Sequence, residues 1–249
     1  MSQTDNILVE KIGCISVIKI NTPPQNYLKS PSFISRELLQ NIADDHDTKA
    51  IIITGVGRHF SAGADLNHLF ELAKNHEDLL QAMDAGNALL DHIASLPVPV
   101  AAAINGVCMG GGLEIAIACH IRIASVKSLF AFPEINANLL PGLGGIIRMA
   151  IQSGTFPTLS AVLSGEPFDA QKALEHKIVH QLTEENVLDC TLTYMNTLVA
   201  SKPKKVVVSI MQSIHNAYKL PLHEALQEET RMFCTLALEE AARRKKESS

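Results

Sequence analysis

The sequence predicts an α/β domain with a largely parallel sheet, followed by a helical C-terminal region. Two short apolar runs, AIIITG at 50–55 and VPVAAAI at 98–104, carry the first part of this prediction. Neither run contains a charge, and each leads through glycine into a segment with helical spacing, as expected for strands that are buried on both faces. The repeated strand-then-helix order is typical of parallel α/β sheets. From about residue 184 to the end the pattern is helical.

The N-terminal part predicts a hairpin and a helix. The apolar alternation of 7–20, broken at Gly13, is typical of a β-hairpin. Residues 32–43 have helical spacing, and Pro31 suits the first turn of such a helix.

A loop of small residues, GVGRHFSAGADL at 55–66, follows the first buried strand. Asp65 is placed to cap or charge the start of the next helix. The apolar positions between 69 and 96 recur at helical spacing, which predicts a helical segment in more than one piece.

Asn105 and Gly106 turn the chain after the second buried strand, and residues 113–119 predict a buried helix that starts at the triple glycine. Further short strands are expected at 121–125, 129–132 and 178–182, and further helices at 146–153, 159–164 and 169–176.

Composition excludes several classes of function. Of the 249 residues, 47% are hydrophobic and 19% charged, which provides ample core and argues against disorder. The net charge of −5 lacks the basic balance of a nucleic-acid-binding domain. The one basic cluster, Arg243 to Lys246, stands among glutamates and is interpreted as a solvated helix end.

Cysteine usage and the termini suggest a cytoplasmic protein. The five cysteines form no CxxC pair, so neither a disulfide framework nor a zinc site is expected, and a reducing compartment fits best. No secretory signal precedes the first strand. The apolar stretch 96–119 contains two prolines and four glycines, which predicts a strand–turn–helix rather than a membrane span.

Two glutamates stand out because burying a carboxylate is costly. Glu114 follows Gly110, Gly111 and Gly112, in the first turn of the expected helix. The unpaired N–H groups of such a helix end can hold a developing oxyanion. The alternative is a tight strand–helix turn with a glutamate that complements the helix dipole.

The second glutamate, Glu134, follows Pro133 and lies 20 residues beyond the first, so one short helix cannot present both. Gly63 to Asp65 forms a second small-residue loop that can supply another backbone N–H. Taken alone, these are a surface glutamate and an ordinary connector. Together, two carboxylates and two N–H loops predict a site that adds water to a carbonyl compound or moves a proton.

Other nucleotide and hydrolase motifs do not fit. The segment 106–112 lacks the Lys-Ser/Thr of a P-loop, GLGG at 142–145 is not a dinucleotide fingerprint after a strand, and no GxSxG nucleophile elbow occurs.

Three segments, HFSAGADL (59–66), NGVCMGGGLEIAIAC (105–119) and FPEINANLLPGLGG (132–145), make the chain similar to the enoyl-CoA hydratase/isomerase (crotonase) family. The similarity extends over about 7–235. It implies a crotonase-like spiral of ββα units, two roughly perpendicular sheets and a C-terminal helical region that builds trimers. Accordingly, we expect a core with the active site at 1–183 and an oligomerisation region at 184–249.

The resemblance also implies roles for individual residues. Ala64 and Gly111 match the backbone donors of the oxyanion hole. Glu134 matches the acid/base at C2, and Glu114 matches the residue that holds and polarises the water. The remaining substrate or CoA contacts implied by the resemblance are Ala62, Asp65, Leu66 and Gly142.

The implied reaction is the reversible syn hydration of a 2-enoyl-CoA thioester to a 3-hydroxyacyl-CoA by a homotrimer or a dimer of trimers. Coenzyme A belongs to the substrate, and no other cofactor, metal, nucleic acid or membrane is expected. The presence of both glutamates favours hydration. The alternatives are an enoyl-CoA isomerase, a polyketide-type dehydratase or decarboxylase that acts on a carrier-bound acyl group, and a non-catalytic binding subunit.

The chain departs from the family pattern at three places. His120 stands where aspartate is usual, and a structural role is expected for it. Asn67 and His68 replace a more basic continuation of the ADL loop. The chain ends soon after Phe233, where many relatives continue with an aromatic and basic tail; only Arg243 to Lys246 remain as a substitute.

Overall fold

The computed structural model describes residues 6–247 and is built on a six-stranded sheet. Its order is β1-β2-β3-β4-β6-β9; the β1–β2 pair is antiparallel and every other pair is parallel. The predicted hairpin and parallel core are therefore confirmed. The strands are β1 Ile7–Ile12, β2 Ile15–Ile20, β3 Ala50–Gly55, β4 Val100–Ile104, β6 Ile121–Ser125 and β9 Gln181–Thr183.

A second, three-stranded sheet has the order β5-β7-β8. It consists of β5 (Val107–Met109), β7 (Leu129–Ala131) and β8 (Phe168–Asp169). The sequence predicted only β7. The other two strands have three and two residues, which is too short for an alternating pattern to appear.

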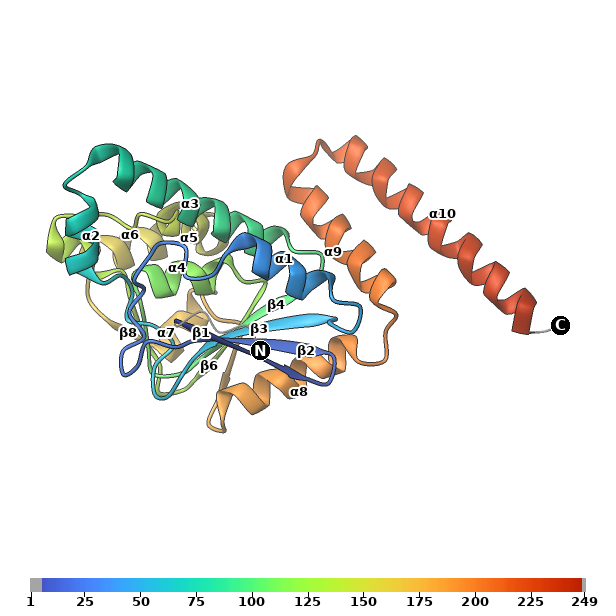
Figure 1. Cartoon of the computed structure of the whole chain (residues 1–249), viewed down its shortest axis with the longest axis horizontal. Coiled ribbons are helices and arrows are strands. Elements are labelled where there is room, and N and C mark those ends of the chain that lie inside the picture. The colour runs from blue at the N-terminus through green and yellow to red at the C-terminus, as the bar shows by residue number, and fades with distance from the viewer. Residues whose placement is uncertain (1–5, 248–249) are drawn as a thin grey trace.

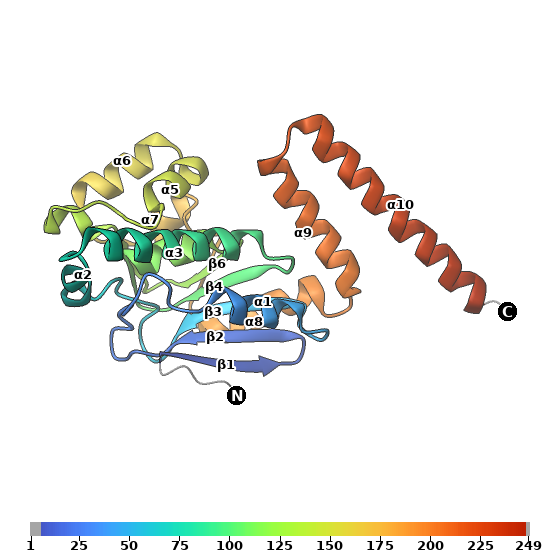
Figure 2. The same cartoon turned by 45° about the horizontal axis from the view of Figure 1, so that its top comes forward.

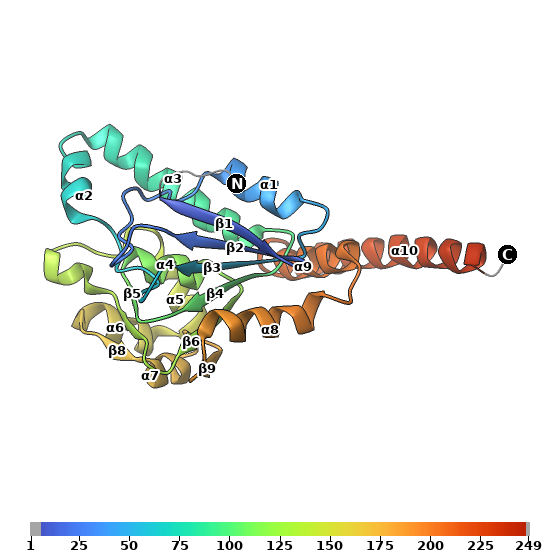
Figure 3. The same cartoon turned by 60° about the horizontal axis from the view of Figure 1, so that its bottom comes forward.

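Helices cover both faces of the large sheet (Figure 3). One face packs on the main core, which includes helices α1 (Arg36–Asp44), α3 (His76–Ser95) and α4 (Gly111–Ala118). The other face packs on α8 (Val187–Val199), which contacts β2, β3, β4 and β6. All eight residues of α4 are buried, so this helix is apolar on every side except at Glu114.

Local capping sets the helix starts. The helix expected at 32–43 begins at Arg36, because the Ser35 hydroxyl accepts a hydrogen bond from the Leu38 N–H at 3.1 Å. Asp65 caps α2 (Leu66–Leu72) as predicted, since its carboxylate accepts from the Asn67 N–H. The helical segment after it is in two pieces, α2 and α3, as expected.

The remaining helices follow strands of the second sheet or lie in the C-terminal region. They are the 3₁₀ helix η1 Pro133–Ala137 and the α-helices α5 Gly145–Ser153, α6 Thr155–Ser164, α7 Ala170–Glu175, α9 Lys204–Lys219 and α10 Leu222–Glu247. Figure 2 shows α5 and α6 at the end of the molecule opposite to α10.

The C-terminal helices α9 and α10 form an antiparallel pair that projects from the core (Figure 1). No residue of α10 is buried. The expected helical region after residue 183 is thus observed, but α8 packs on the sheet, and the expected division at 183/184 stays a prediction. Within residues 6–247, no helix is both long enough and apolar enough to cross a bilayer.

A buried arginine closes the C-terminal end of α4. The Arg122 guanidinium donates to the Ile117 carbonyl at 3.3 Å and to the Cys119 carbonyl, while its Nε donates to the Ile178 carbonyl at 2.6 Å. Burial lowers the pKa of Arg122 to about 10, so the group is still charged at neutral pH. A cation at a helix C-terminus is stabilised by the helix dipole.

Replacement of Arg122 by methionine is expected to destabilise the fold by about 3 kcal/mol, because several buried carbonyls lose a charged donor. Arg231→Met, which removes an exposed ion pair with Glu228, should change stability by less than about 0.5 kcal/mol. Chemical denaturation followed by circular dichroism measures both. Equal stability of the two variants would contradict this account of α4.

Candidate active site

The N-terminus of α4 forms the floor of the site. Strand β5 enters it through Gly110, which has a φ of 51°. A Cβ at Gly110 would lie 2.8 Å from Oε1 of Glu134. Glycine is needed there both for the left-handed backbone and for space, and the carboxylate of Glu134 consequently lies directly against the start of α4.

A second loop approaches the same helix end. The Gly63 carbonyl accepts from the Leu28 N–H at 2.8 Å, and the Asp65 N–H donates to the Leu28 carbonyl at 3.0 Å. These bonds fix the loop on either side of Ala64. A Cβ at Gly63 would lie 3.3 Å from the Gly111 nitrogen, so the two segments meet backbone to backbone.

The N–H groups of Ala64 and Gly111 are close and unpaired. A Cβ at Gly111 would lie 3.9 Å from the Ala64 nitrogen. Among residues 6–247, neither N–H donates a hydrogen bond to another protein group. The two donors that the sequence singled out are therefore brought together, and both are available to a ligand oxygen.

Glu114 is buried, with 2% of its surface exposed. Its Oε1 accepts two backbone hydrogen bonds, from Leu143 at 2.7 Å and Gly145 at 2.8 Å. Burial raises the pKa of Glu114, whereas these two bonds and the positive charge of Arg148 act in the opposite direction. The carboxylate is thus held in one orientation by the loop that precedes α5.

Glu134 lies in the first turn of η1 and has a different environment. Its Oε2 is buried and has no hydrogen-bond partner among the described residues. Burial, together with the negative charge of Glu114, raises the pKa of Glu134 to about 7. A buried carboxyl oxygen without a protein partner and with a raised pKa is typical of a functional site.

The other predicted contact residues lie around these groups. The Ala62 N–H donates to the Gln25 carbonyl at 2.9 Å, which places this residue beside the loop after β2. Asp65 serves as the α2 cap, and Leu66 is 47% exposed. Gly142 lies in the loop before α5, where its carbonyl accepts from the Asn87 amide at 3.2 Å.

Three residues at the site carried no sequence signal. Asn87 and Asp91 lie on α3, and Arg148 lies on α5. Arg148 donates to the Leu143 carbonyl and, at 2.7 Å, to the Asp91 carboxylate. They are separated by up to 61 positions in the sequence, so only the tertiary fold reveals that they share one network.

The histidine that departs from the family pattern is structural, as expected. His120 Nδ1 accepts from the Val100 N–H at 3.0 Å, and Nε2 lies 3.1 Å from the Ala94 carbonyl. Burial lowers the pKa of His120. The neighbouring Cys119 is also buried, and its pKa is raised to about 12, so its thiol is unreactive at neutral pH. No cluster of metal-ligating side chains occurs in the part of the chain described.

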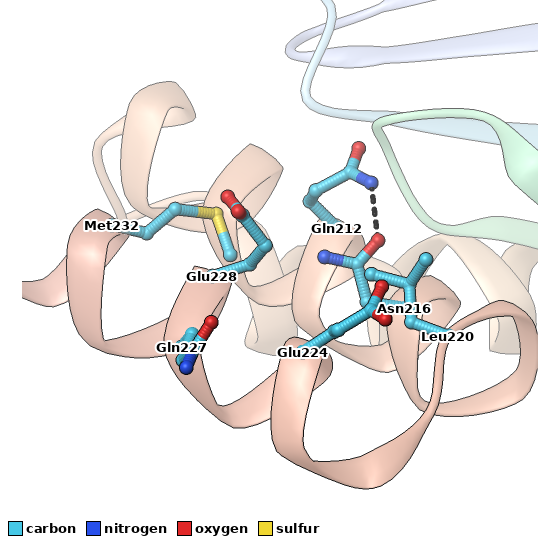
Figure 4. A pocket seen from close by; sticks show the side chains of 7 residues that line it. All are labelled: Gln212, Asn216, Leu220, Glu224, Gln227, Glu228 and Met232. Atoms are coloured by element: carbon cyan, nitrogen blue, oxygen red, sulfur yellow. Dashed lines mark hydrogen bonds between the residues drawn. The ribbon is translucent and has the colours of Figure 1, made fainter.

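A cavity of about 460 Å³ lies elsewhere, between α9 and α10 (Figure 4). Its lining includes Gln212, whose amide donates to Asn216 at 2.8 Å, and Glu228. All of its lining residues lie between 212 and 232, so neither Glu114 nor Glu134 lines it.

The enoyl-CoA hydratase/isomerase family model matches residues 10–248. The chain belongs to this family. A probable enoyl-CoA hydratase of Bacillus subtilis is 40% identical over 66% of this chain and 64% of its own length. A short-chain-enoyl-CoA hydratase of Clostridium acetobutylicum is 31% identical over 93% of this chain and 89% of its own.

Solved structures confirm the crotonase fold. An enoyl-CoA hydratase subunit structure from Geobacillus kaustophilus has a TM-score of 0.82 at 28% identity, covering 95% of this chain and 91% of that one. Pseudomonas aeruginosa DspI has a TM-score of 0.84 at 30% identity, covering 95% and 90%. The two sheets and C-terminal helices expected from the crotonase resemblance are therefore established.

The raised pKa of Glu134 makes a prediction about pH and stability. With an ordinary value of 4.5 and a folded value of about 7, the neutral carboxyl favours folding below pH 4.5, and this contribution is lost as the pH rises through 7. Glu134→Gln does not titrate, so relative to wild type it should gain about 2 kcal/mol between pH 4.5 and pH 8.5, after allowance for partial exposure.

Denaturant unfolding at the two pH values measures this gain. Glu166→Gln, at an exposed position on the loop before β8, controls for the loss of a surface charge. A stability difference for Glu134→Gln that is independent of pH would show that the Glu134 carboxyl is not held neutral by the fold.

Proposed function

We propose that the chain catalyses the reversible hydration of a 2-enoyl-CoA thioester to a 3-hydroxyacyl-CoA. The observation that carries the proposal is the buried, unpartnered Oε2 of Glu134 beside the start of α4. A carboxyl group with a pKa of about 7 is suited to give and take a proton near neutral pH.

In the hydration direction, the thioester oxygen accepts hydrogen bonds from the Ala64 and Gly111 N–H groups. This draws electrons away from C3. Water gives a proton to Glu114 while its oxygen forms a bond to C3, and the double-bond electrons move to the thioester as an enolate. Two such donors can stabilise that oxyanion by about 3 kcal/mol each in favourable sites.

Glu134 then gives its proton to C2, and the enolate collapses to the saturated thioester. The proton taken up by Glu114 returns to Glu134 through the pair, so the site regains its starting state. Dehydration follows the same steps in reverse. The pair therefore works with one shared proton, as expected for two carboxyls that repel each other.

The environment of Glu114 favours hydration over isomerisation. Moving a double bond needs one base to carry a proton, whereas adding water needs a second group to hold and deprotonate that water. The fold buries Glu114 and fixes it with two backbone donors, at a cost that a binding-only protein would have no reason to retain.

The relatives support an acyl-CoA substrate, since two of them are named enoyl-CoA hydratases. One is named for short-chain substrates, which makes crotonyl-CoA the first compound to test. We further propose that no cofactor is used beyond the coenzyme A of the substrate. The five free cysteines support a reducing, cytoplasmic location.

We also propose that the protein is a homotrimer or a dimer of trimers. Two exposed apolar faces support this, because patches of this kind usually mark interaction surfaces. The first lies on α5 and α6 and the second on α9 and α10. Their exposed residues are Ile147, Ile151, Phe156, Leu159 and Leu163 on the first, and Ile210, Ile214, Tyr218, Leu222, Leu226, Phe233 and Leu238 on the second.

Wild-type protein is expected to remove the conjugated-thioester absorbance of crotonyl-CoA. Glu134→Gln and Glu114→Gln should each lower kcat by about 10²–10⁴-fold, because each loses a proton-transfer step. Circular dichroism checks folding, and Glu166→Gln is the matched control that should retain turnover. A folded Glu134→Gln variant with undiminished turnover would disprove the assignment.

Sedimentation analysis is expected to find wild-type protein as a trimer or hexamer. Ile151→Glu and Phe233→Glu place a charge on the two apolar faces in turn, and at least one should dissociate the assembly, since burying an unpaired charge is costly. Gln171→Glu, at an exposed polar position of α7, should leave it intact. A stable wild-type monomer at micromolar concentration would refute the proposal.

A further inference from the structure

The position of Glu114 is decided by a loop rather than by its own helix. Only Oε1 of Glu114 accepts the bonds from Leu143 and Gly145. No hydrogen bond among the described residues ends on its Oε2. The loop before α5 thus fixes one carboxylate oxygen through two hydrogen bonds, so whatever holds that loop also determines the geometry of Glu114.

Helix α3 and the side chain of Arg148 hold the loop. The Asn87 amide donates to the Gly142 carbonyl at 3.2 Å. Arg148 donates with one guanidinium nitrogen to the Leu143 carbonyl and with the other to Asp91 at 2.7 Å. The same peptide region that donates its N–H to Glu114 is therefore anchored through its carbonyl to Arg148.

The Arg148–Asp91 bridge has one largely covered partner and one exposed partner, which suits a positioning role for Arg148. The Arg148 side chain is 17% exposed, whereas Asp91 is 70% exposed. An exposed ion pair contributes little to stability by itself. The Arg148–Asp91 pair instead orients the planar guanidinium of Arg148, whose geometry a lysine cannot reproduce.

The charges around Glu114 come from three elements. Arg148 on α5 is positive, Glu134 on η1 lies close enough to be influenced by the charge of Glu114, and Asp91 on α3 lies behind Arg148. Of these three side chains, only Arg148 carries a positive charge. It favours the ionised form of Glu114 against the effect of burial.

We propose that Arg148, oriented by Asp91, is a positioning residue that holds Glu114 in the geometry and charge state needed to take a proton from the water that adds at C3. This inference rests on the proposed hydration. Arg148 touches neither water nor thioester in this scheme and acts through the Leu143 peptide and through its charge. Glu134 and the two oxyanion donors are independent of it.

Two reactions distinguish the role of Glu114 from that of Glu134. Hydration of crotonyl-CoA needs both glutamates. Exchange of the C2 protons of butyryl-CoA with deuterium oxide needs only a base at C2 and the oxyanion donors, because no water is added. Arg148→Met is expected to lower hydration kcat by about 100-fold, the size of effect that a displacement of about 1 Å can cause, and to reduce exchange far less.

Two further variants separate charge from geometry. Arg148→Lys keeps the charge but not the two-pronged bridge, and Asp91→Asn loses the orienting carboxylate; both should fall between wild type and Arg148→Met. Lys11→Met, which removes an exposed ion pair with Asp45 at the end of α1, should resemble wild type in both reactions. Equal losses of hydration and exchange in Arg148→Met would overturn the inference, as would unchanged hydration.

A titration provides a readout that does not depend on turnover. The carboxyl signal of Glu114 can be followed by NMR in ¹³C-labelled protein and assigned with Glu114→Gln. Arg148→Met should raise the pKa of Glu114. The acidic limb of the pH–rate profile for hydration should move to higher pH by the same amount. An unchanged pKa would overturn the inference. Wild-type protein that shows neither hydration nor exchange, but in which Arg148→Met raises this pKa, would instead contradict the proposed function alone.

Discussion

The buried helix α4 is the constraint on which the site depends. It lies in the apolar core with every residue covered, so neither of its ends is open to bulk water. Arg122 satisfies the C-terminal carbonyls, whereas the Gly111 N–H at the other end has no protein acceptor among the described residues. The helix thus presents a free N–H group at its positive end, which is an arrangement that binds oxyanions.

Glycine makes the rest of the site compatible with that helix end. Side chains at Gly63, Gly110 or Gly145 would collide with backbone or with the carboxylates of Glu134 and Glu114. The backbone of the Ala64 loop and both carboxylates therefore crowd around a few atoms of α4. The consequence is a site shaped chiefly by main chain, in which small displacements matter more than the loss of any one contact.

Much of this arrangement could be predicted from the sequence. The buried strands and the triple glycine located α4, and the family resemblance assigned Ala64, Gly111 and the two glutamates to one site. Strands β5 and β8 escaped prediction because two or three residues carry no periodicity. The start of α1 was misplaced because a Ser35 cap outweighed the preference of proline for a first turn.

The network of Asn87, Asp91 and Arg148 could not be predicted from the sequence, for a different reason. Their local sequence is that of ordinary polar positions on amphipathic helices, and nothing in it indicates a partner more than 50 positions away. Only the packing of α3 against the loop before α5 brings them together. Predicting such a network requires the tertiary fold, since hydrogen bonds to backbone carbonyls place no demand on the partner's residue type.

The two carboxylates are distinguished by environment rather than by chemistry. Glu114 accepts hydrogen bonds from two N–H groups and is influenced by the positive charge of Arg148, and all three favour its ionised form against the effect of burial. Glu134 has an unpartnered buried oxygen and lies near the negative charge of Glu114, and both features favour its protonated form. Burial raises the pKa of both groups, but the groups around Glu114 oppose that effect and those around Glu134 do not. Two identical side chains in such different surroundings are suited to be base and acid in one reaction. In the proposed hydration, that asymmetry determines which glutamate takes a proton from water and which one delivers a proton to carbon.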